Sequence, residues 1–204
     1  MDYLALGDSY TIGEGVPEAG RWTVQLAAAL RCEGIPVEDP RTIAATGWTT
    51  DELAAAMDAA EPLGRWDCAS LLVGVNDQYR GRDLTAYRAG FHPLLERAIG
   101  LVGGHTPRVL VLSIPDWGAT PFGAASGRDL AAVARELDAF NRCAADLCAL
   151  HGVCFVDVTT LSRERGAAPG MLVEDGLHPS AAMYRLWAER ALPFARRLLA
   201  DVEK

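Results

Sequence analysis

The sequence predicts an α/β fold built on a five-stranded parallel sheet with helices on both faces. Short apolar segments that end in glycine or turn residues alternate along the whole chain with longer segments of helical periodicity. Parallel strands need long crossover connections, and the segments between the apolar runs are long enough to be helices. No internal repeat or low-complexity linker interrupts the alternation, so residues 1–204 are interpreted as a single domain.

The five expected strands are the short apolar runs of the chain. Residues 2–7, 68–74 and 108–114 are apolar almost throughout, which is typical of strands buried on both faces. Residues 41–45 form a weaker strand after a proline-broken connection, and residues 152–157 form the fifth. The carboxyl ends of such strands meet at one edge of the sheet, and ligands bind there in open α/β folds.

The expected helices are the segments in which apolar side chains recur every three or four residues. They cover residues 20–32, 51–60, 83–101, 128–150 and 181–200. The clearest stripe, in residues 128–150, comprises Leu130, Val133, Leu137, Phe140, Ala144, Leu147 and Cys148. Ser180 is expected to be the N-cap of the last helix, and Pro193 is expected to kink it.

Composition and charge exclude several classes of function. The chain is half apolar and carries 19 basic against 27 acidic residues, a net charge of −8, which disfavours nucleic acid and anionic membranes as partners. No apolar run is long enough for stable membrane insertion, and the first ten residues lack a basic signal-peptide region. The five cysteines are an odd number and suit reduced thiols, so a cytoplasmic location is expected.

Residues suited to catalysis follow four of the expected strands. The first strand leads into Ser9, the second into Gly47, the third into Asn76, and a turn beyond the fifth contains Asp175 and His178. Each has a structural alternative as a cap or turn residue. Together they supply a nucleophile, a base, a carboxylate that orients the base, and three donors for an oxyanion. Imidazole, with a pKa of about 6.5, suits the removal of a serine proton at neutral pH.

The remaining candidate ligand groups are interpreted as structural. Cys143, Cys148, His151 and Cys154 lie close together in the sequence, but their spacing has no C-x2-C pair and fits no familiar zinc pattern. His92 lies within an expected helix beside a proline. No metal and no cofactor are predicted.

These residues and their order resemble the GDSL esterases, also called SGNH hydrolases. The first block reads GDSY, with Tyr10 in place of the usual leucine, and the third reads GVND from Gly74. The second block matches at Gly47, and the fifth matches at Asp175 and His178. The resemblance implies a flavodoxin-like three-layer α/β/α sandwich and ester hydrolysis. By the same resemblance Ser9 is the nucleophile, His178 the base and Asp175 its orienting carboxylate. The backbone N–H groups of Ser9 and Gly47 and the side-chain amide of Asn76 then form the oxyanion hole.

The expected function is hydrolysis of short-chain carboxylic esters, small soluble molecules, through an acyl-enzyme on Ser9. No long insertion suggests a lid over the site. An acyltransferase, a thioesterase or a lysophospholipase could use the same triad, and a flavodoxin-like binding module is the non-enzymatic alternative. Residues expected to contact the substrate are Tyr10, Trp48, Asp77, Tyr79, Trp117 and Phe122. The natural ester and the oligomeric state are not encoded in these patterns.

Overall fold

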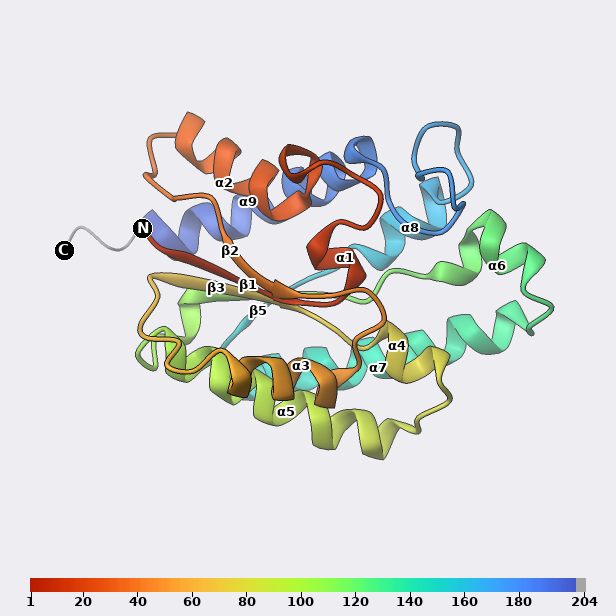
Figure 1. The fold of residues 1–204 in the computed structure, drawn as a ribbon, viewed down its shortest axis with the longest axis horizontal. Helices are drawn as coiled ribbons and strands as arrows, with labels where there is room; N and C mark the ends of the chain where they lie inside the picture. The colour runs from red at the N-terminus through yellow and green to blue at the C-terminus, as the bar shows by residue number, and fades with distance from the viewer. Residues whose placement is uncertain (201–204) are drawn as a thin grey trace.

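The computed structural model describes residues 1–200 and contains a five-stranded sheet in which neighbouring strands are all parallel (Figure 1). The strands are β1 (Tyr3–Gly7), β2 (Arg41–Ala44), β3 (Cys68–Leu72), β4 (Val109–Leu112) and β5 (Cys154–Val156), in the order β2-β1-β3-β4-β5. Every residue of β1, β3 and β4 is buried, as their continuous apolar sequences predict. The predicted fold class is confirmed.

Helices cover both faces of the sheet, because β2 is added on one side of β1 and the later strands are added on the other side. Right-handed crossovers that run in opposite directions along a parallel sheet lie on opposite faces. Figure 1 shows α2 and α9 above the sheet and α3, α5 and α7 below it. These helices are α2 (Trp22–Cys32), α3 (Thr50–Ala59), α5 (Leu84–Leu101), α7 (Leu130–His151) and α9 (Ala181–Ala200).

The boundaries of the long helices follow from capping residues as well as from periodicity. Asp129 caps α7 by accepting hydrogen bonds from the N–H groups of Ala131 and Ala132, and Gly152 ends it in the left-handed conformation. Ser180 Oγ accepts from the Met183 N–H at 3.4 Å, which agrees with its expected place at the start of α9. Pro193 lies inside α9, which continues through it.

Four short helices were not expected from the sequence. They are α1 (Ser9–Ile12), α4 (Val75–Tyr79), α6 (Pro121–Ala125) and α8 (Thr159–Arg165), and three single turns of 3-10 helix occur at Glu18–Gly20, Thr106–Arg108 and Trp117–Ala119. Segments of four to seven residues are too short to show a helical repeat. All four follow the carboxyl ends of strands, so they lie at the edge where a ligand is expected.

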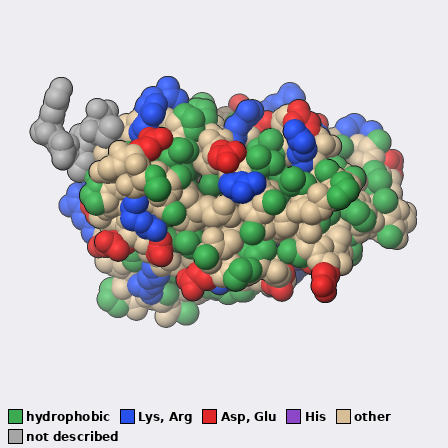
Figure 2. Space-filling view, turned by 90° about the horizontal axis from the view of Figure 1, so that it is seen from above, with side chains coloured by type: hydrophobic (Ala, Val, Ile, Leu, Met, Phe, Trp, Pro, Cys, Tyr) green, Lys and Arg blue, Asp and Glu red, His purple; other side chains and the backbone are tan. Residues whose placement is uncertain are grey.

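The surface carries both signs of charge without a single large basic patch on the face seen from above in Figure 2. Arginine side chains alternate there with acidic and hydrophobic ones. Among residues 1–200, no helix is both long and apolar enough to cross a bilayer.

Asp8 is a fully buried carboxyl group at the carboxyl end of β1. Its Oδ1 accepts a hydrogen bond from the Tyr10 N–H at 3.0 Å and caps α1, whereas Oδ2 has no hydrogen-bond partner among the described residues. Burial raises the pKa of Asp8 from 3.8 to about 7, against the effect of the Tyr10 N–H and with a contribution from nearby Asp77. Below about pH 7 the folded protein therefore favours the protonated form of Asp8.

We expect Asp8 to make the free energy of unfolding fall as the pH rises from about 4 to about 7. The unfolded chain releases this proton at about pH 4, and the folded chain holds it to about pH 7, so the stabilisation is full below the first value and lost above the second. The shift corresponds to at most about 4 kcal/mol. Urea unfolding across this range measures the slope.

Asp8→Asn should lose this part of the pH dependence, because the amide does not ionise but keeps an oxygen for the Tyr10 N–H. Asp146→Asn, at an exposed position on α7, is the matched control and should keep the wild-type slope. An unchanged slope in Asp8→Asn would contradict the assignment.

Candidate active site

Ser9 lies at the turn between β1 and α1, where close packing fixes the backbone. A Cβ atom added at Gly7 would collide with the Thr11 side chain and the Leu72 carbonyl, so the chain passes closer to its neighbours than another residue would allow. Ser9 is the first residue of α1 and its side chain is buried. Its backbone N–H therefore has no carbonyl partner within the helix.

Gly47 and Asn76 follow the two strands that flank β1. Gly47 has a φ of +86°, a conformation that favours glycine, and its carbonyl accepts a hydrogen bond from Arg80 at 2.6 Å. Asn76 lies in the first turn of α4, and its side-chain nitrogen donates to the Trp48 carbonyl at 2.9 Å. Within the described part of the chain, the N–H groups of Ser9 and Gly47 donate no hydrogen bond. Two backbone donors are thus free to bind an oxygen.

His178 and Asp175 form a hydrogen-bonded pair in the turn before α9. His178 Nδ1 lies 2.6 Å from Asp175 Oδ2, while Asp175 Oδ1 accepts from the N–H groups of Leu177 and His178 at 2.8 and 2.9 Å. Burial by itself would raise the pKa of Asp175, but the hydrogen bonds from the ring and the backbone outweigh it and hold that pKa below 3.8. An ionised Asp175 accepts Nδ1–H, which leaves Nε2 of the ring as the basic nitrogen.

One pocket of about 190 Å³ brings together the residues that the sequence places far apart. Its lining comprises Ser9, Tyr10, Thr46, Gly47, Val75, Asn76, Tyr79, Trp117, Phe122, Leu177 and His178. The Ser9 hydroxyl and the His178 ring share this pocket without a hydrogen bond between them, and the ring of Tyr10 lies 5.7 Å from that of His178. Unliganded sites often hold such groups more loosely than the complex does.

Aromatic side chains form one wall of the pocket. Tyr79 meets Trp117 edge-on with ring centroids 5.3 Å apart, and Phe122 lies 6.1 Å from Trp117. The Arg128 guanidinium covers Tyr79 at 4.2 Å from its ring centroid. The wall is apolar toward the pocket, and these contacts hold its members against each other.

Two residues expected to contact a substrate do not line this pocket. Asp77 is fully buried, and it accepts hydrogen bonds from the Thr50 N–H and hydroxyl at 3.0 and 2.8 Å and from Arg82 at 3.2 Å. It therefore joins α4 to the start of α3 rather than facing a ligand. Trp48 is half-buried, and its carbonyl accepts a hydrogen bond from the side chain of Asn76.

Three lining residues were not expected from the sequence. Thr46, Val75 and Leu177 directly precede Gly47, Asn76 and His178, so the only signal for them was their place beside the motif residues. None offers a titratable group, which is why a search for chemistry passes over them.

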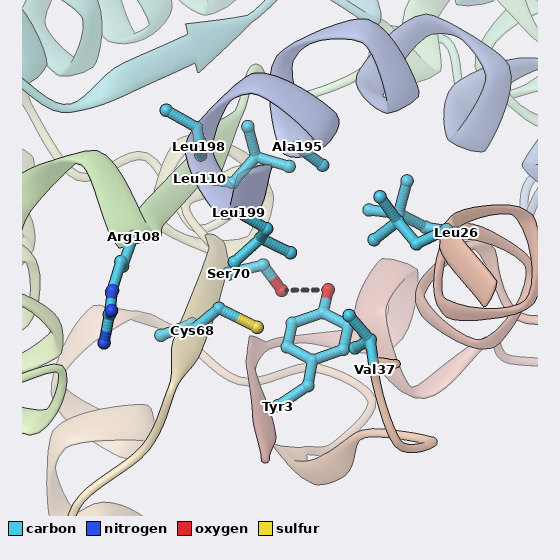
Figure 3. Close-up of a pocket in the computed structure, with 12 residues that line it drawn as sticks. Tyr3, Leu26, Val37, Cys68, Ser70, Arg108, Leu110, Ala195, Leu198 and Leu199 are labelled. Atoms are coloured by element: carbon cyan, nitrogen blue, oxygen red, sulfur yellow. Dashed lines mark hydrogen bonds between the residues drawn. The ribbon is translucent and has the colours of Figure 1, made fainter. Parts of the chain in front are cut away.

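A second pocket lies at the opposite end of the sheet and is too small for a substrate (Figure 3). Its volume is about 20 Å³, and its lining includes Tyr3 and Cys68 at the amino ends of β1 and β3. Tyr3 donates to Ser70 Oγ at 2.8 Å inside it, which satisfies the buried phenol. The pocket that contains Ser9 is the candidate active site because it brings Ser9, Asn76 and His178 together.

Solved structures share this fold at low sequence identity. TesA matches with a TM-score of 0.76 and 22% identity over 98% of this chain and 100% of its own. A lipase/acylhydrolase from Enterococcus faecalis matches with a TM-score of 0.72 and 19% identity over 98% of this chain and 97% of its own. Axe2, an acetylxylan esterase from Geobacillus stearothermophilus, matches with a TM-score of 0.72 and 20% identity over 95% of this chain and 93% of its own.

No curated protein sequence matches the chain significantly. The model of the GDSL-like lipase/acylhydrolase family, however, matches residues 5–186, and this span contains Ser9, Gly47, Asn76, Asp175 and His178. With the order of these residues and the fold in agreement, the chain belongs to the GDSL-like lipase/acylhydrolase family.

Proposed function

We propose that the protein hydrolyses short-chain carboxylic esters through an acyl-enzyme on Ser9. The observation that carries the proposal is that Ser9, Gly47, Asn76 and His178 line one pocket while Asp175 holds the ring of His178. Acyl transfer through a tetrahedral intermediate needs a nucleophile, an oriented base and oxyanion donors. Ser9 would be the nucleophile and His178, held by Asp175, the base. The oxyanion donors would come from Ser9, Gly47 and Asn76.

In the proposed reaction, His178 Nε2 takes the proton of the Ser9 hydroxyl as Oγ attacks the ester carbonyl carbon. The carbonyl oxygen becomes an oxyanion, and the imidazolium is stabilised by the carboxylate of Asp175. Collapse of the intermediate breaks the bond to the alkoxy group, which leaves as an alcohol with the proton from His178. Water then repeats the sequence on the acyl-enzyme and releases the acid.

The proposed oxyanion hole consists of the N–H groups of Ser9 and Gly47 and the side-chain amide of Asn76. The first two are free, and the amide nitrogen of Asn76 carries two hydrogens, of which the Trp48 carbonyl accepts one. That contact fixes the plane of the amide while leaving its second hydrogen for a ligand. Such preorganised donors stabilise charge without reorganising during the reaction.

The size of the pocket supports a short acyl group as the preferred substrate. A volume of about 190 Å³ lies below the roughly 300 Å³ at which pockets for drug-sized ligands begin. The aromatic wall of Tyr79, Trp117 and Phe122 closes one side of it. A longer acyl chain would have to displace this wall or extend into solvent.

Ser9→Ala should abolish hydrolysis of p-nitrophenyl acetate, because no other hydroxyl is proposed to attack. A fluorophosphonate probe should add covalently to Ser9 in the wild type, as mass spectrometry of peptides would show, and should not label the variant. Ser126→Ala, at a serine that bonds the Gly123 carbonyl in α6, is the control and should keep both activity and labelling. Turnover by a folded Ser9→Ala would refute the proposed nucleophile.

Asn76→Ala should lower kcat by about 10²–10³-fold with little change in KM, because an oxyanion donor acts mainly in the transition state. Steady-state kinetics separates the two constants. Gln25→Ala removes another half-buried amide, one that bonds the Gly20 and Ala181 carbonyls outside the pocket, and should keep kcat. A change in KM alone would contradict a role for Asn76 as an oxyanion donor.

Phe122→Ala should shift the preference toward longer acyl chains, because it opens the aromatic wall. We expect the ratio of kcat/KM for p-nitrophenyl octanoate to that for the acetate to rise at least about tenfold. Phe194→Ala, which removes a half-buried phenylalanine on α9, should leave the ratio unchanged. An unchanged ratio in Phe122→Ala would place the acyl chain elsewhere.

A further inference from the structure

A cluster of two histidines and a glutamate lies between α5 and α7, outside the pocket of Ser9. His92 and Glu96 are one helical turn apart on α5, and His151 is the last residue of α7. The two helices lie side by side on the lower face of the sheet in Figure 1, with Tyr87 stacked on Phe140 at 4.4 Å between centroids. The sequence separates His92 from His151 by 59 residues, so the cluster exists only in the folded chain.

The donor atoms of the cluster converge on a small volume. His92 Nε2 lies 2.8 Å from His151 Nε2 and 3.7 Å from Glu96 Oε1, and all three donor atoms lie within 4.8 Å of one another. Two ligands at zinc-ligand distances of 2.0–2.1 Å in tetrahedral geometry are about 3.3 Å apart. The observed separations between the donor atoms differ from this value by at most about 1.5 Å, so small rotations of the side chains would bring all three atoms into contact with one ion.

The chemistry of these donors suits a late first-row divalent ion. Two imidazoles and one carboxylate match the nitrogen and oxygen ligands of zinc, whereas magnesium and calcium prefer oxygen ligands alone. His151 is at the carboxyl end of α7, where the helix dipole favours a cation. The side chains of His92 and Glu96 are 34% and 57% exposed, so an ion would reach them directly from solvent.

The place of the cluster in the fold indicates a structural role. His151 precedes the amino end of β5, whereas Ser9 follows the carboxyl end of β1, so the cluster and the candidate active site are at opposite ends of a parallel sheet. None of the three residues lines the pocket of Ser9. An ion held here would join the middle of α5 to the end of α7.

We propose that His92, Glu96 and His151 bind one divalent transition-metal ion of the zinc type and that this ion joins α5 to α7. The alternative occupant of the same geometry is a proton, shared in a hydrogen bond between two neutral imidazoles. If the occupant is a metal ion, the protein binds one ion per chain, and if it is a proton, the protein binds none there. A titration with metal distinguishes these two cases.

The test is calorimetric titration of the chelator-treated full chain with zinc chloride. We expect one ion per chain, and an affinity at least about tenfold weaker in His92→Ala and in His151→Ala, since loss of even an outer partner of a metal ligand typically costs that much. Glu96→Gln should weaken binding as well. His105→Ala removes an exposed histidine outside the cluster, and His178→Ala removes the other histidine that is paired with a carboxylate; both should bind zinc as the wild type does.

A second readout keeps the test independent of calorimetry. Zinc should raise the melting temperature of the wild type but not of His151→Ala, because an ion that binds only the folded chain stabilises it. Equal zinc binding by the wild type and both histidine variants would overturn the proposal, as would failure of the wild type to bind one ion. Loss of ester hydrolysis on chelation, restored by zinc, in a chain that stays folded by circular dichroism would overturn the structural role.

Discussion

The parallel alignment of β2, β1 and β3 determines the geometry of the candidate active site. Gly7, the last residue of β1, is paired with Ala44 on one side and Leu72 on the other. The three strands therefore end at the same level, and the loops that follow them leave the sheet side by side. This arrangement puts Ser9, Gly47 and Asn76 around one pocket although the sequence spreads them over a third of the chain.

His178 reaches the same pocket by a different route, because it follows no strand directly. Its turn is held by a hydrogen bond from the Val173 N–H to the His178 carbonyl at 2.9 Å and by an antiparallel bridge between Leu172 and Pro179. The Phe122 N–H also donates to the Gly176 carbonyl at 3.1 Å, which joins this turn to the aromatic wall. The proposed oxyanion donors thus lie directly after the strands, Ser9 and Asn76 in the first turns of α1 and α4, whereas the proposed base lies on a turn fixed by a few hydrogen bonds. Under the proposed mechanism, the missing hydrogen bond between His178 and Ser9 would form by a movement of this turn when substrate binds.

Strands and long helices, whose patterns repeat along the sequence, were predicted correctly, whereas the sequence does not determine the direction in which a single side chain points. Long helices and buried strands were located to within about two residues, since their patterns extend over several turns or over a whole strand. Motif residues at strand ends were placed together because parallel strands share an edge. Asp77, however, was among the residues expected to contact the substrate. Adjacent residues of a helix point about 100° apart, and α4 turns Asp77 toward Thr50. Similarly, no local pattern relates His92 to His151, since only the packing of α5 on α7 brings them together.

The environments of Asp8 and Asp175 separate two carboxyl groups that the sequence alone does not distinguish. Asp175 is partly exposed and accepts three N–H hydrogen bonds, so its pKa is lowered and it carries a negative charge. Asp8 is buried, and one of its oxygens has no hydrogen-bond partner within residues 1–200; burial raises its pKa to about 7. Under the proposed mechanism, a negative charge beside His178 stabilises the imidazolium, whereas a negative charge on Asp8, the residue before Ser9, would oppose the oxyanion. Under the proposed mechanism, the fixed negative charge of Asp175 therefore lies beside the base, while burial reduces the charge on Asp8 below about pH 7.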